Sequence, residues 1–435
     1  MKQRKISSLM VVVFICLANV NAQDWPQYLG PGRNSVSPQK NLLLSWPENG
    51  PEVLWTVKVG PGNGGPVAKD GKVYILDRDD QVGDIMRCFK LSNGEELWKY
   101  GYDSPGTVRF SGSRSVPALD GNYIYSCGHN GDLYCIDINT HRPVWNKNIW
   151  TDFGGGEIPT WAIVQCPLVF GDLVILASQA PQAGVVAYEL LTGNVKWTTP
   201  PLGPVGYVSP SMVRIGEEYQ VVMITAATGG HGTPLTGGGV YGISPLNGEI
   251  LWEYTNWKCI IPAPSAFDAG EGKVLITGGY EAGAAMIRIE KRADGGYGVT
   301  ELYRNVDFGA HTKPPLYDDG YFYAQYSTNN RRDGLVCMSM DGQVMWKTGR
   351  EPGFNKGSMI LADGFIFATD GDKTLYLIKP DPSAFKPVAS AEVLEIAADL
   401  AEPRYGNQNW APIALADGKL LIRDQNQIVC VKVAE

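Results

Sequence analysis

A set of aromatic, basic and polar residues that could bind a ligand lies between predicted β-strands. Aromatic rings stack on planar compounds and sugars, and Arg, Lys and His side chains form charge-assisted hydrogen bonds with carboxylates. Together these residue types would suit a sugar or a carboxylated ring compound. The candidate ligand-binding residues are Arg114, Glu157, Trp161, Tyr207, Trp257, Lys258, His311, Lys313, Lys356, Asn409 and Trp410.

The histidines and acidic residues form no metal or catalytic motif. His129, His231 and His311 lie far apart and lack the short spacing of paired metal ligands, so we expect no metal site. Glu157 and Asp307 could act as a ligand or a general base, but their spacing does not distinguish them from surface acids. We therefore assign no catalytic residue.

The cysteines are predicted to be mostly buried, unpaired thiols. Cys88 and Cys135 each lie ten residues before a tryptophan, where equivalent segments carry Ala187 and Gly242. A position shared by Cys, Ala and Gly indicates a small buried site in which cysteine acts as a hydrophobic residue. The other cysteines matched in this way are Cys337 and Cys430, with Cys166 matching Val116, Ser209 and Ala411 before a proline. The pattern leaves the states of Cys127 and Cys259 open.

A tryptophan recurs along the chain at the end of a repeated phrase. The recurring residues are Trp55, Trp98, Trp145, Trp197 and Trp252, at spacings of 43, 47, 52 and 55, and Trp346, which lies 94 residues further on. In three copies an Asn-Gly or Thr-Gly pair precedes the tryptophan and supplies the left-handed backbone of a tight hairpin. Each phrase is therefore predicted to be two short strands joined by a turn, with the tryptophan as a structural residue.

A second hairpin precedes these phrases, so that each unit has four strands. Its turns are expected at Asp70-Gly71, Asp120-Gly121, Phe170-Gly171, Gly272, Asp319-Gly320, Asp363-Gly364 and Asp417-Gly418. Four strands in roughly 40 to 55 residues are typical of a β-propeller blade. Seven units extend to about Val388, although the fifth is degenerate around residues 299–303 and the seventh lacks its tryptophan.

The eighth unit ends after three strands, at residues 429–433, and residues 53–59 have the pattern of its missing outer strand. Pairing of these two segments would remove the exposed edges of the ring. We predict an all-β, eight-bladed β-propeller closed by pairing of an N-terminal strand with the C-terminal blade. The propeller is expected to span residues 53–435, with residues 23–52 as an extended segment packed on it.

Strand parity predicts which connections share a face. Four alternating strands place the first and third turns of every blade at one end and the remaining connections at the other. The tight Asp-Gly and Asn-Gly turns should therefore share one face, and the long, varied loops should share the other. Loops displayed on a rigid scaffold commonly carry function, so the candidate ligand-binding residues should surround one mouth of the central channel.

The repeated Thr-Gly-x-x-x-Trp phrase resembles the tryptophan-docking repeat of the pyrroloquinoline-quinone-like (PQQ-like) propeller superfamily. The opening Asp24-Trp-Pro-Gln-Tyr-Leu-Gly-Pro-Gly-Arg33, followed by Val36-Ser-Pro38, is similar to the start of many exported bacterial members. The resemblance covers nearly all of the chain after its first residues. It implies the fold more specifically than a function, because the superfamily includes quinoprotein dehydrogenases, an outer-membrane assembly lipoprotein and sensor domains.

Three functions remain open from this resemblance. The favoured one is a non-catalytic binding or scaffold protein of the cell envelope, without a cofactor, whose partner is an envelope protein or a glycan. The first alternative is an alcohol or sugar dehydrogenase that uses PQQ and Ca²⁺. That family's pattern implies a pair of adjacent cysteines over the cofactor, whereas this chain has no Cys-Cys pair and no Cys-x-x-Cys-His haem motif. The second alternative is a role in outer-membrane protein assembly.

The N-terminus and the composition predict an exported protein. Lys2, Arg4 and Lys5 precede a short apolar run, which indicates a signal peptide over residues 1–22 with cleavage after Ala22. Cys16 follows Phe14-Ile15 and so lacks the small residue that lipoprotein processing requires. No transmembrane segment is expected, and the net charge of -8 disfavours nucleic acid as a partner. We expect a periplasmic or secreted monomer.

Overall fold

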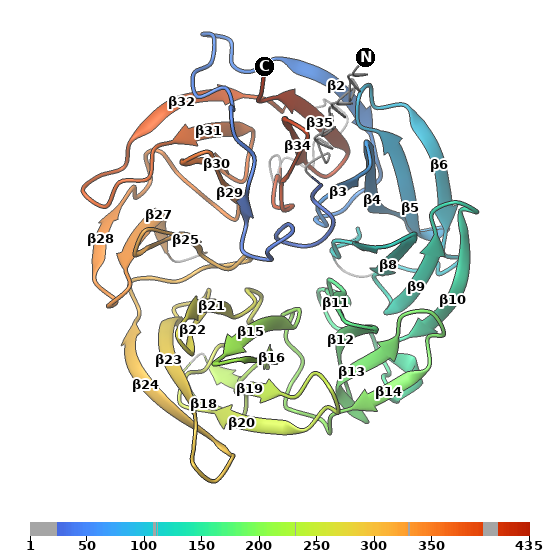
Figure 1. Cartoon of the computed structure of the whole chain (residues 1–435), viewed down its shortest axis with the longest axis vertical. Helices are drawn as coiled ribbons and strands as arrows, with labels where there is room; N and C mark the ends of the chain where they lie inside the picture. Colours follow the sequence, from blue (N-terminus) through green and yellow to red (C-terminus); the bar gives the residue numbers. More distant parts are fainter. Residues whose placement is uncertain (1–23, 108–109, 111, 231, 329–330, 395–407) are drawn as a thin grey trace, which may run out of the picture.

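The computed structural model describes residues 24–107, 110, 112–230, 232–328, 331–394 and 408–435. The predicted signal peptide lies outside these residues. The described chain forms eight radial sheets around a central channel (Figure 1), and its only helical element is the single turn η1 (Thr151–Phe153). The predicted all-β, eight-bladed propeller is therefore confirmed.

Each blade is an antiparallel sheet whose first strand lies nearest the channel. Blades 1 to 4 consist of β3 (Val67–Lys69), β4 (Lys72–Asp79), β5 (Gly83–Lys90) and β6 (Glu96–Gly101); β7 (Ala118–Asp120), β8 (Tyr123–Cys127), β9 (Asp132–Asp137) and β10 (Arg142–Asn148); β11 (Leu168–Phe170), β12 (Leu173–Ala180), β13 (Ala183–Glu189) and β14 (Val195–Thr198); and β15 (Ser211–Ile215), β16 (Glu218–Ile224), β19 (Val240–Ile243) and β20 (Ile250–Tyr254). A separate hairpin, β17 (Thr228–Gly230) and β18 (Thr233–Thr236), is inserted in blade 4.

The remaining blades follow the same order. They consist of β21 (Phe267–Gly270), β22 (Lys273–Gly278), β23 (Gly283–Lys291) and β24 (Tyr297–Asn305); β25 (Leu316–Asp318), β26 (Tyr321–Ser327), β27 (Arg332–Ser339) and β28 (Val344–Lys347); β29 (Met359–Ala362), β30 (Phe365–Thr369), β31 (Thr374–Ile378) and β32 (Pro387–Glu392); and β33 (Ala414–Ala416), β34 (Lys419–Arg423) and β35 (Gln427–Lys432). Middle strands such as β12 are fully buried because neighbouring blades cover both of their faces, whereas the outer strand β6 has no buried residue.

Blade 8 is completed by β2 (Val53–Lys58), which pairs antiparallel with β35. Trp55 lies directly opposite Cys430, and Val53 lies opposite Val431. The first regular strand of the ring thus forms the outer strand of the last sheet, as the sequence predicted. This pairing covers the outward edge of β35 and joins the beginning of the propeller to its last blade, so the ring is closed.

The repeated tryptophans join neighbouring blades. The indole N–H of Trp145 in blade 2 donates to the carbonyl of Leu190 in blade 3 at 2.8 Å. Trp55, Trp197 and Trp346 donate in the same way to Leu91, Pro245 and Asp381 of the following blades. Trp98 instead stacks on His141, and Trp252 donates to Gln220 of its own blade. In blade 5, Tyr303 occupies the corresponding position, opposite Met286.

The cysteines of the described chain are buried and free. Cys88, Cys135 and Cys337 each lie opposite the tryptophan of their own blade, in the position that Gly242 takes in blade 4. At Gly242 a Cβ would lie 2.0 Å from the Trp252 ring, so no side chain fits beside the indole in this blade. The prediction of small buried sites is confirmed, and Cys127 and Cys259, whose state the sequence left open, are also free and buried.

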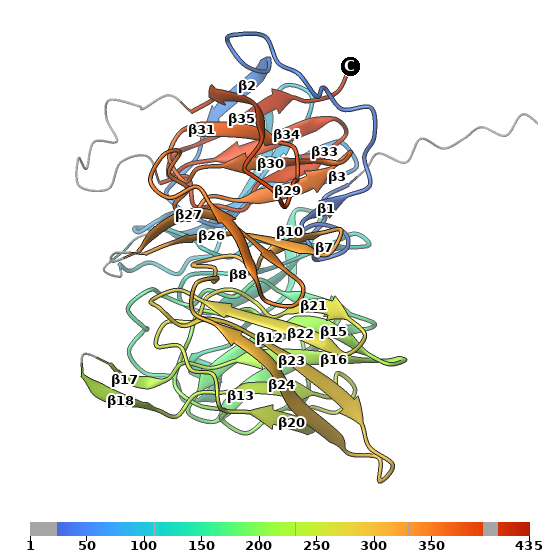
Figure 2. The same cartoon turned by 90° about the vertical axis from the view of Figure 1, so that its left-hand side faces the viewer.

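The two ends of the propeller differ as strand parity predicted. The tight turns, such as Asp70-Gly71 with φ values of 50° and 70°, lie at one end, the short-turn face. The connections that enter the innermost strands lie at the other end, the long-loop face. In Figure 2 the β17–β18 hairpin projects from the long-loop face and the β23–β24 hairpin from the opposite one.

Residues 24–52, the N-terminal segment, cross the channel at the short-turn face (Figure 1). Trp25 exchanges two hydrogen bonds of 2.9 Å with Ala68 of β3, and β1 (Val36–Ser37) pairs parallel with β29. Further contacts join Pro26 to Leu119, Arg33 to Val169, Gln39 to Leu415 and Leu42 to Ala434. The segment therefore contacts blades 1, 2, 3, 7 and 8, and it lies across the short-turn end of the channel.

Candidate functional site

Part of the predicted ligand-binding set surrounds the channel at the long-loop face. Arg114 lies in the loop between β6 and β7, where its guanidinium donates to the carbonyls of Gly112 at 2.9 Å and Phe110 at 2.6 Å. The Phe110 ring stacks on Trp161, with centroids 4.0 Å apart and planes 7° from parallel. Tyr207 bonds to the backbone of Trp161 and lies near Arg114. Blades 2, 3 and 4 thus meet through these loops.

His311 continues this arrangement at blade 6. Its Nδ1 lies 2.7 Å from the carbonyl oxygen of Ser327, and its ring packs edge to face against Tyr280 at 5.0 Å. Burial lowers the pKa of His311 to about 4, and the positive charge of Lys356 acts in the same direction. His311 is therefore neutral near pH 7 and serves as a hydrogen-bonding group.

Two lysines follow on blades 6 and 7. The Lys313 Nζ donates to the Thr312 hydroxyl at 3.1 Å and to the Lys356 carbonyl at 2.7 Å. The Lys356 Nζ lies 4.0 Å from the centre of the Trp410 ring, within cation–π range. Burial lowers the pKa of Lys313 to about 7 and that of Lys356 to about 8. We call Arg114, Trp161, Tyr207, His311, Lys313, Lys356 and Trp410 the rim.

Four candidates do not join the rim through a contact. Glu157 is exposed, and Lys258 donates at 2.6 Å to the carbonyl of Gly237, beside the blade 4 insertion. Trp257 is buried and donates to the carbonyl of Ala282. Asn409 is fully buried next to Trp410, and neither polar atom of its side chain has a hydrogen-bond partner.

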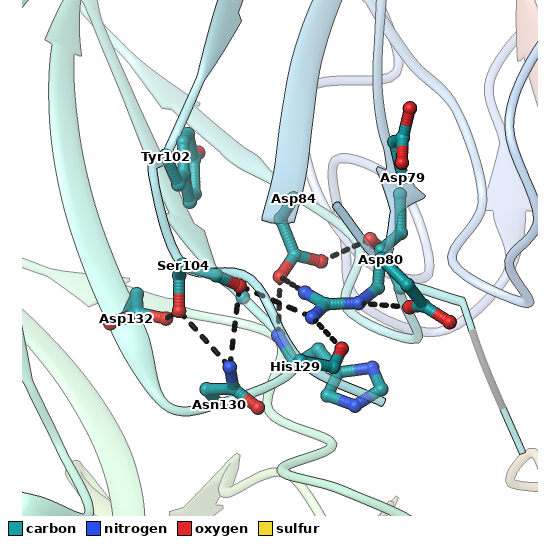
Figure 3. A network of polar contacts seen from close by, with 12 residues as sticks. Asp79, Asp80, Asp84, Tyr102, Ser104, His129, Asn130 and Asp132 are labelled. Atoms are coloured by element: carbon teal, nitrogen blue, oxygen red, sulfur yellow. Dashed lines mark hydrogen bonds and ion pairs between the residues drawn. The ribbon is translucent and has the colours of Figure 1, made fainter. Parts of the chain in front are cut away.

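A second polar network lies between blades 1 and 2, and the sequence analysis did not find it (Figure 3). Asp84 is buried and accepts hydrogen bonds from Arg78 at 2.7 Å, from the backbone N–H of His129 at 2.9 Å and from Ser113. Arg78 also donates to the carbonyls of Ser104 and Gly106, which fixes the loop that leads to Arg114. In the sequence, Arg78 and Asp84 look like ordinary surface charges.

The network around Asp84 has the geometry of a structural site. Burial raises the pKa of Asp84 to about 6, although Arg78 and the Ser113 hydroxyl oppose the shift. The bond from His129 comes from its backbone, so its imidazole does not link Ser113 to the carboxylate as a catalytic triad would require. Burial also lowers the pKa of the His129 side chain to about 4. The network positions the long loop of blade 2 beside the channel.

The described part of the chain contains no cluster of three metal-ligating side chains and no helix that could span a membrane. No group of three His, Cys, Asp or Glu side chains lies close enough there to hold an ion, and His231 falls outside the described residues. No helix among these residues has the length and apolar character needed to cross a bilayer.

Sequence comparison points to one family over part of the chain. The sequence model of the family described as "Outer membrane protein assembly factor BamB" matches residues 82–258. The protein of that name from Shewanella oneidensis is 25% identical over 166 residues, which are 38% of this chain and 40% of the relative. The Aliivibrio fischeri protein is 26% identical over 91 residues, 20% of this chain and 23% of the relative. The matches thus span at most two fifths of these relatives.

Solved structures match over nearly the whole propeller. BamB from Moraxella catarrhalis has a TM-score of 0.58 at 10% identity, covering 88% of this chain and 99% of that one. A quinohemoprotein alcohol dehydrogenase from Comamonas testosteroni has a TM-score of 0.63 at 13% identity, covering 95% and 80%. At such identities the likeness describes the fold alone.

Proposed function

Because the chain belongs to the PQQ-like superfamily of eight-bladed propellers, we propose that it is an exported, non-catalytic binding or scaffold protein of the cell envelope. Its partner is an envelope protein or a glycan, which it recognises with the long-loop face. The observation that carries this proposal is the rim, where aromatic and basic side chains from several blades gather at one channel mouth. The partial match to an outer membrane protein assembly factor supports an envelope role.

The chemistry of the rim supports binding over quinone-dependent oxidation. Calcium requires several oxygen ligands, with carboxylates prominent among them. The charged rim residues are instead Arg114, Lys313 and Lys356, and the carboxylate of Asp307 is bound by Arg331 at 2.5 Å. This donor set does not fit a calcium-centred PQQ site. The dehydrogenase alternative is tested directly by adding PQQ and Ca²⁺ and measuring quinone absorbance and alcohol-dependent dye reduction. Either signal would favour the dehydrogenase over the binding protein.

The binding role is tested by crosslinking the purified protein to cell-envelope extract and by a glycan array. Trp161→Ala should reduce capture, because it removes the ring that stacks on Phe110 at the rim. Leu246→Ala is the matched control, because Leu246 is 76% exposed in a turn of the short-turn face. Capture that is equal in both variants, or absent from the unmodified protein in both assays, would contradict the proposal.

A further inference from the structure

A small cavity lies inside the channel where the N-terminal segment meets the rim. Leu29 and Ser35 line it from the segment, and Lys313, Lys356 and Gln325 line it from blades 6 and 7. Its volume is about 20 Å³, enough for a water-sized atom such as the oxygen of an anionic group. The N-terminal segment covers it from the short-turn side, so a ligand would enter from the long-loop face.

The lysines of this cavity have no acidic partner. Within the described residues, no carboxylate lies within ion-pair distance of Lys313 or Lys356, whereas the buried Arg78 is paired with Asp84 at 2.7 Å. Removing a cation from water is costly unless a counter-charge replaces the lost hydration. Lys313 uses two of its three N–H groups on Thr312 and Lys356, which leaves one for a ligand.

Gln325 is a second, independent indication of a ligand. Its side chain is 6% exposed, and its Nε2 donates to the carbonyl of Thr369 at 2.8 Å. Its Oε1 is buried without a hydrogen-bond partner. An unsatisfied buried acceptor requires a donor. The same cavity thus presents a cation that needs an anion and an amide oxygen that needs a hydroxyl or N–H group.

We infer that the cavity between Lys313, Lys356 and Gln325 binds the anionic group of a hydroxylated acid, either a sugar carboxylate or a sugar phosphate. The oxyanion contacts the two ammonium groups, and a neighbouring hydroxyl donates to Gln325 Oε1. The rest of the ligand extends past Trp410 toward the aromatic rings of the rim. This inference rests on the proposed binding role and gives the chemical class of the ligand.

The test is calorimetric titration of the full mature chain with D-glucuronate, D-glucose 6-phosphate and D-glucose. At least one acid should bind with one site per chain, and glucose should bind more weakly than that acid. The tighter acid identifies the anionic group. Lys313→Met keeps the apolar stem and removes the charge, so it should weaken acid binding about tenfold or more.

Lys99→Met is the matched control, because Lys99 is exposed on the outer strand of blade 1 and should leave the affinity unchanged. Lys356→Met replaces Lys313→Met if thermal unfolding shows that the latter does not fold. The inference is overturned if neither acid binds, if glucose binds as tightly as the acids, or if the folded lysine variant binds like the unmodified protein.

The affinity for D-glucuronate should also depend on pH. Both lysines have pKa values lowered by burial, to about 7 for Lys313 and about 8 for Lys356. Since the anion binds their protonated forms, affinity should be highest below pH 7 and fall as the pH rises toward roughly 9. His311, with a pKa of about 4, stays neutral over this range, and the positive charge of Arg332 adds to the lowering of the Lys356 pKa. An affinity independent of pH would contradict the role of the lysines.

The proposed binding role and the proposed ligand of the cavity can be rejected independently of each other. Titration uses purified protein and small acids, so it does not depend on capturing a partner from the envelope. Acid binding lost in Lys313→Met would support the cavity even if no partner is captured. Partner capture that needs Trp161, without any acid binding, would support the scaffold role and reject the cavity as the ligand site.

Discussion

At the scale of single residues, the turn glycine of the repeat has two separate requirements. Gly193 has a φ of 67°, a conformation that side chains rarely adopt. A Cβ at this position would also lie 2.6 Å from the Trp145 ring of the preceding blade. The same ring donates its N–H to Leu190 in the same turn. The glycine therefore both forms the turn and leaves room for the tryptophan that docks on it.

The two requirements can be separated by two alanine substitutions. Gly171→Ala, at a φ of 60° with nothing within 4 Å of the new Cβ, should cost only the backbone strain, about 1 kcal/mol. Gly193→Ala should cost about 1 to 3 kcal/mol more, because the methyl group overlaps the indole. Urea unfolding of both variants measures the difference. Equal losses of stability would show that the tryptophan does not restrict this turn.

At the scale of elements, the strand that closes the ring holds the first and last parts of the propeller together. β2 pairs with β35 over five residue pairs, from Val53 opposite Val431 to Lys58 opposite Gln427. The adjacent strands of blade 8, β34 and β33, come only from the C-terminus. The stability of blade 8 therefore depends on residues at both ends of the sequence.

A disulfide across this pairing should stabilise the closed ring. In the double variant Lys58→Cys with Gln427→Cys, the new thiols lie on directly opposed residues. Opposed strand residues have Cα atoms within the range that a disulfide spans. Oxidation should stabilise the protein by about 2 to 4 kcal/mol. Thermal unfolding with and without reductant measures the gain, and Lys58→Cys alone should show none. A failure to crosslink in the folded protein would contradict the observed register.

At the scale of the whole molecule, the N-terminal segment and β2 have different tasks. The segment crosses the short-turn end of the channel and adds β1 to blade 7. β2 supplies a strand that blade 8 otherwise lacks. We therefore expect the ring to form without the segment but not to close without β2.

Two truncations distinguish these tasks. A chain that begins at Pro47 keeps β2 and should unfold cooperatively at a lower temperature, with faster hydrogen exchange in β3 and β29, which lose their contacts with Trp25 and β1. A chain that begins at Gly60 lacks β2, leaves blade 8 with three strands and an open edge, and should aggregate. Similar behaviour of the two chains in calorimetry and light scattering would contradict this division.

The sequence predicted the ring because its signals are local. Turn glycines and the tryptophan phrase recur in each unit, so they indicate the blades and the missing outer strand. The parallel pairing of β1 with β29 has no such signal, because it joins short segments from distant parts of the chain. The β17–β18 hairpin was likewise not predicted, since its residues differ from the repeat.

Part of the rim could also be predicted, because the order of the strands follows from the same local signals. Strand parity placed the loops on one face, and this was sufficient to find residues such as Arg114 and Lys356. The path of each long loop depends on contacts between blades, which residue types alone do not reveal. The sequence therefore did not predict that Lys258 contacts the blade 4 insertion. It also did not predict the buried Arg78–Asp84 pair that holds a rim loop.

The pairing of Trp55 with Cys430 also limits when the protein can mature. A ribosome delivers residue 55 long before residue 430, so β2 stays unpaired while the intervening blades are made. Earlier blades can assemble on one another during that time, but the circle stays incomplete until β35 has been delivered. A premature stop before residue 427 would thus leave β2 with nothing to pair with.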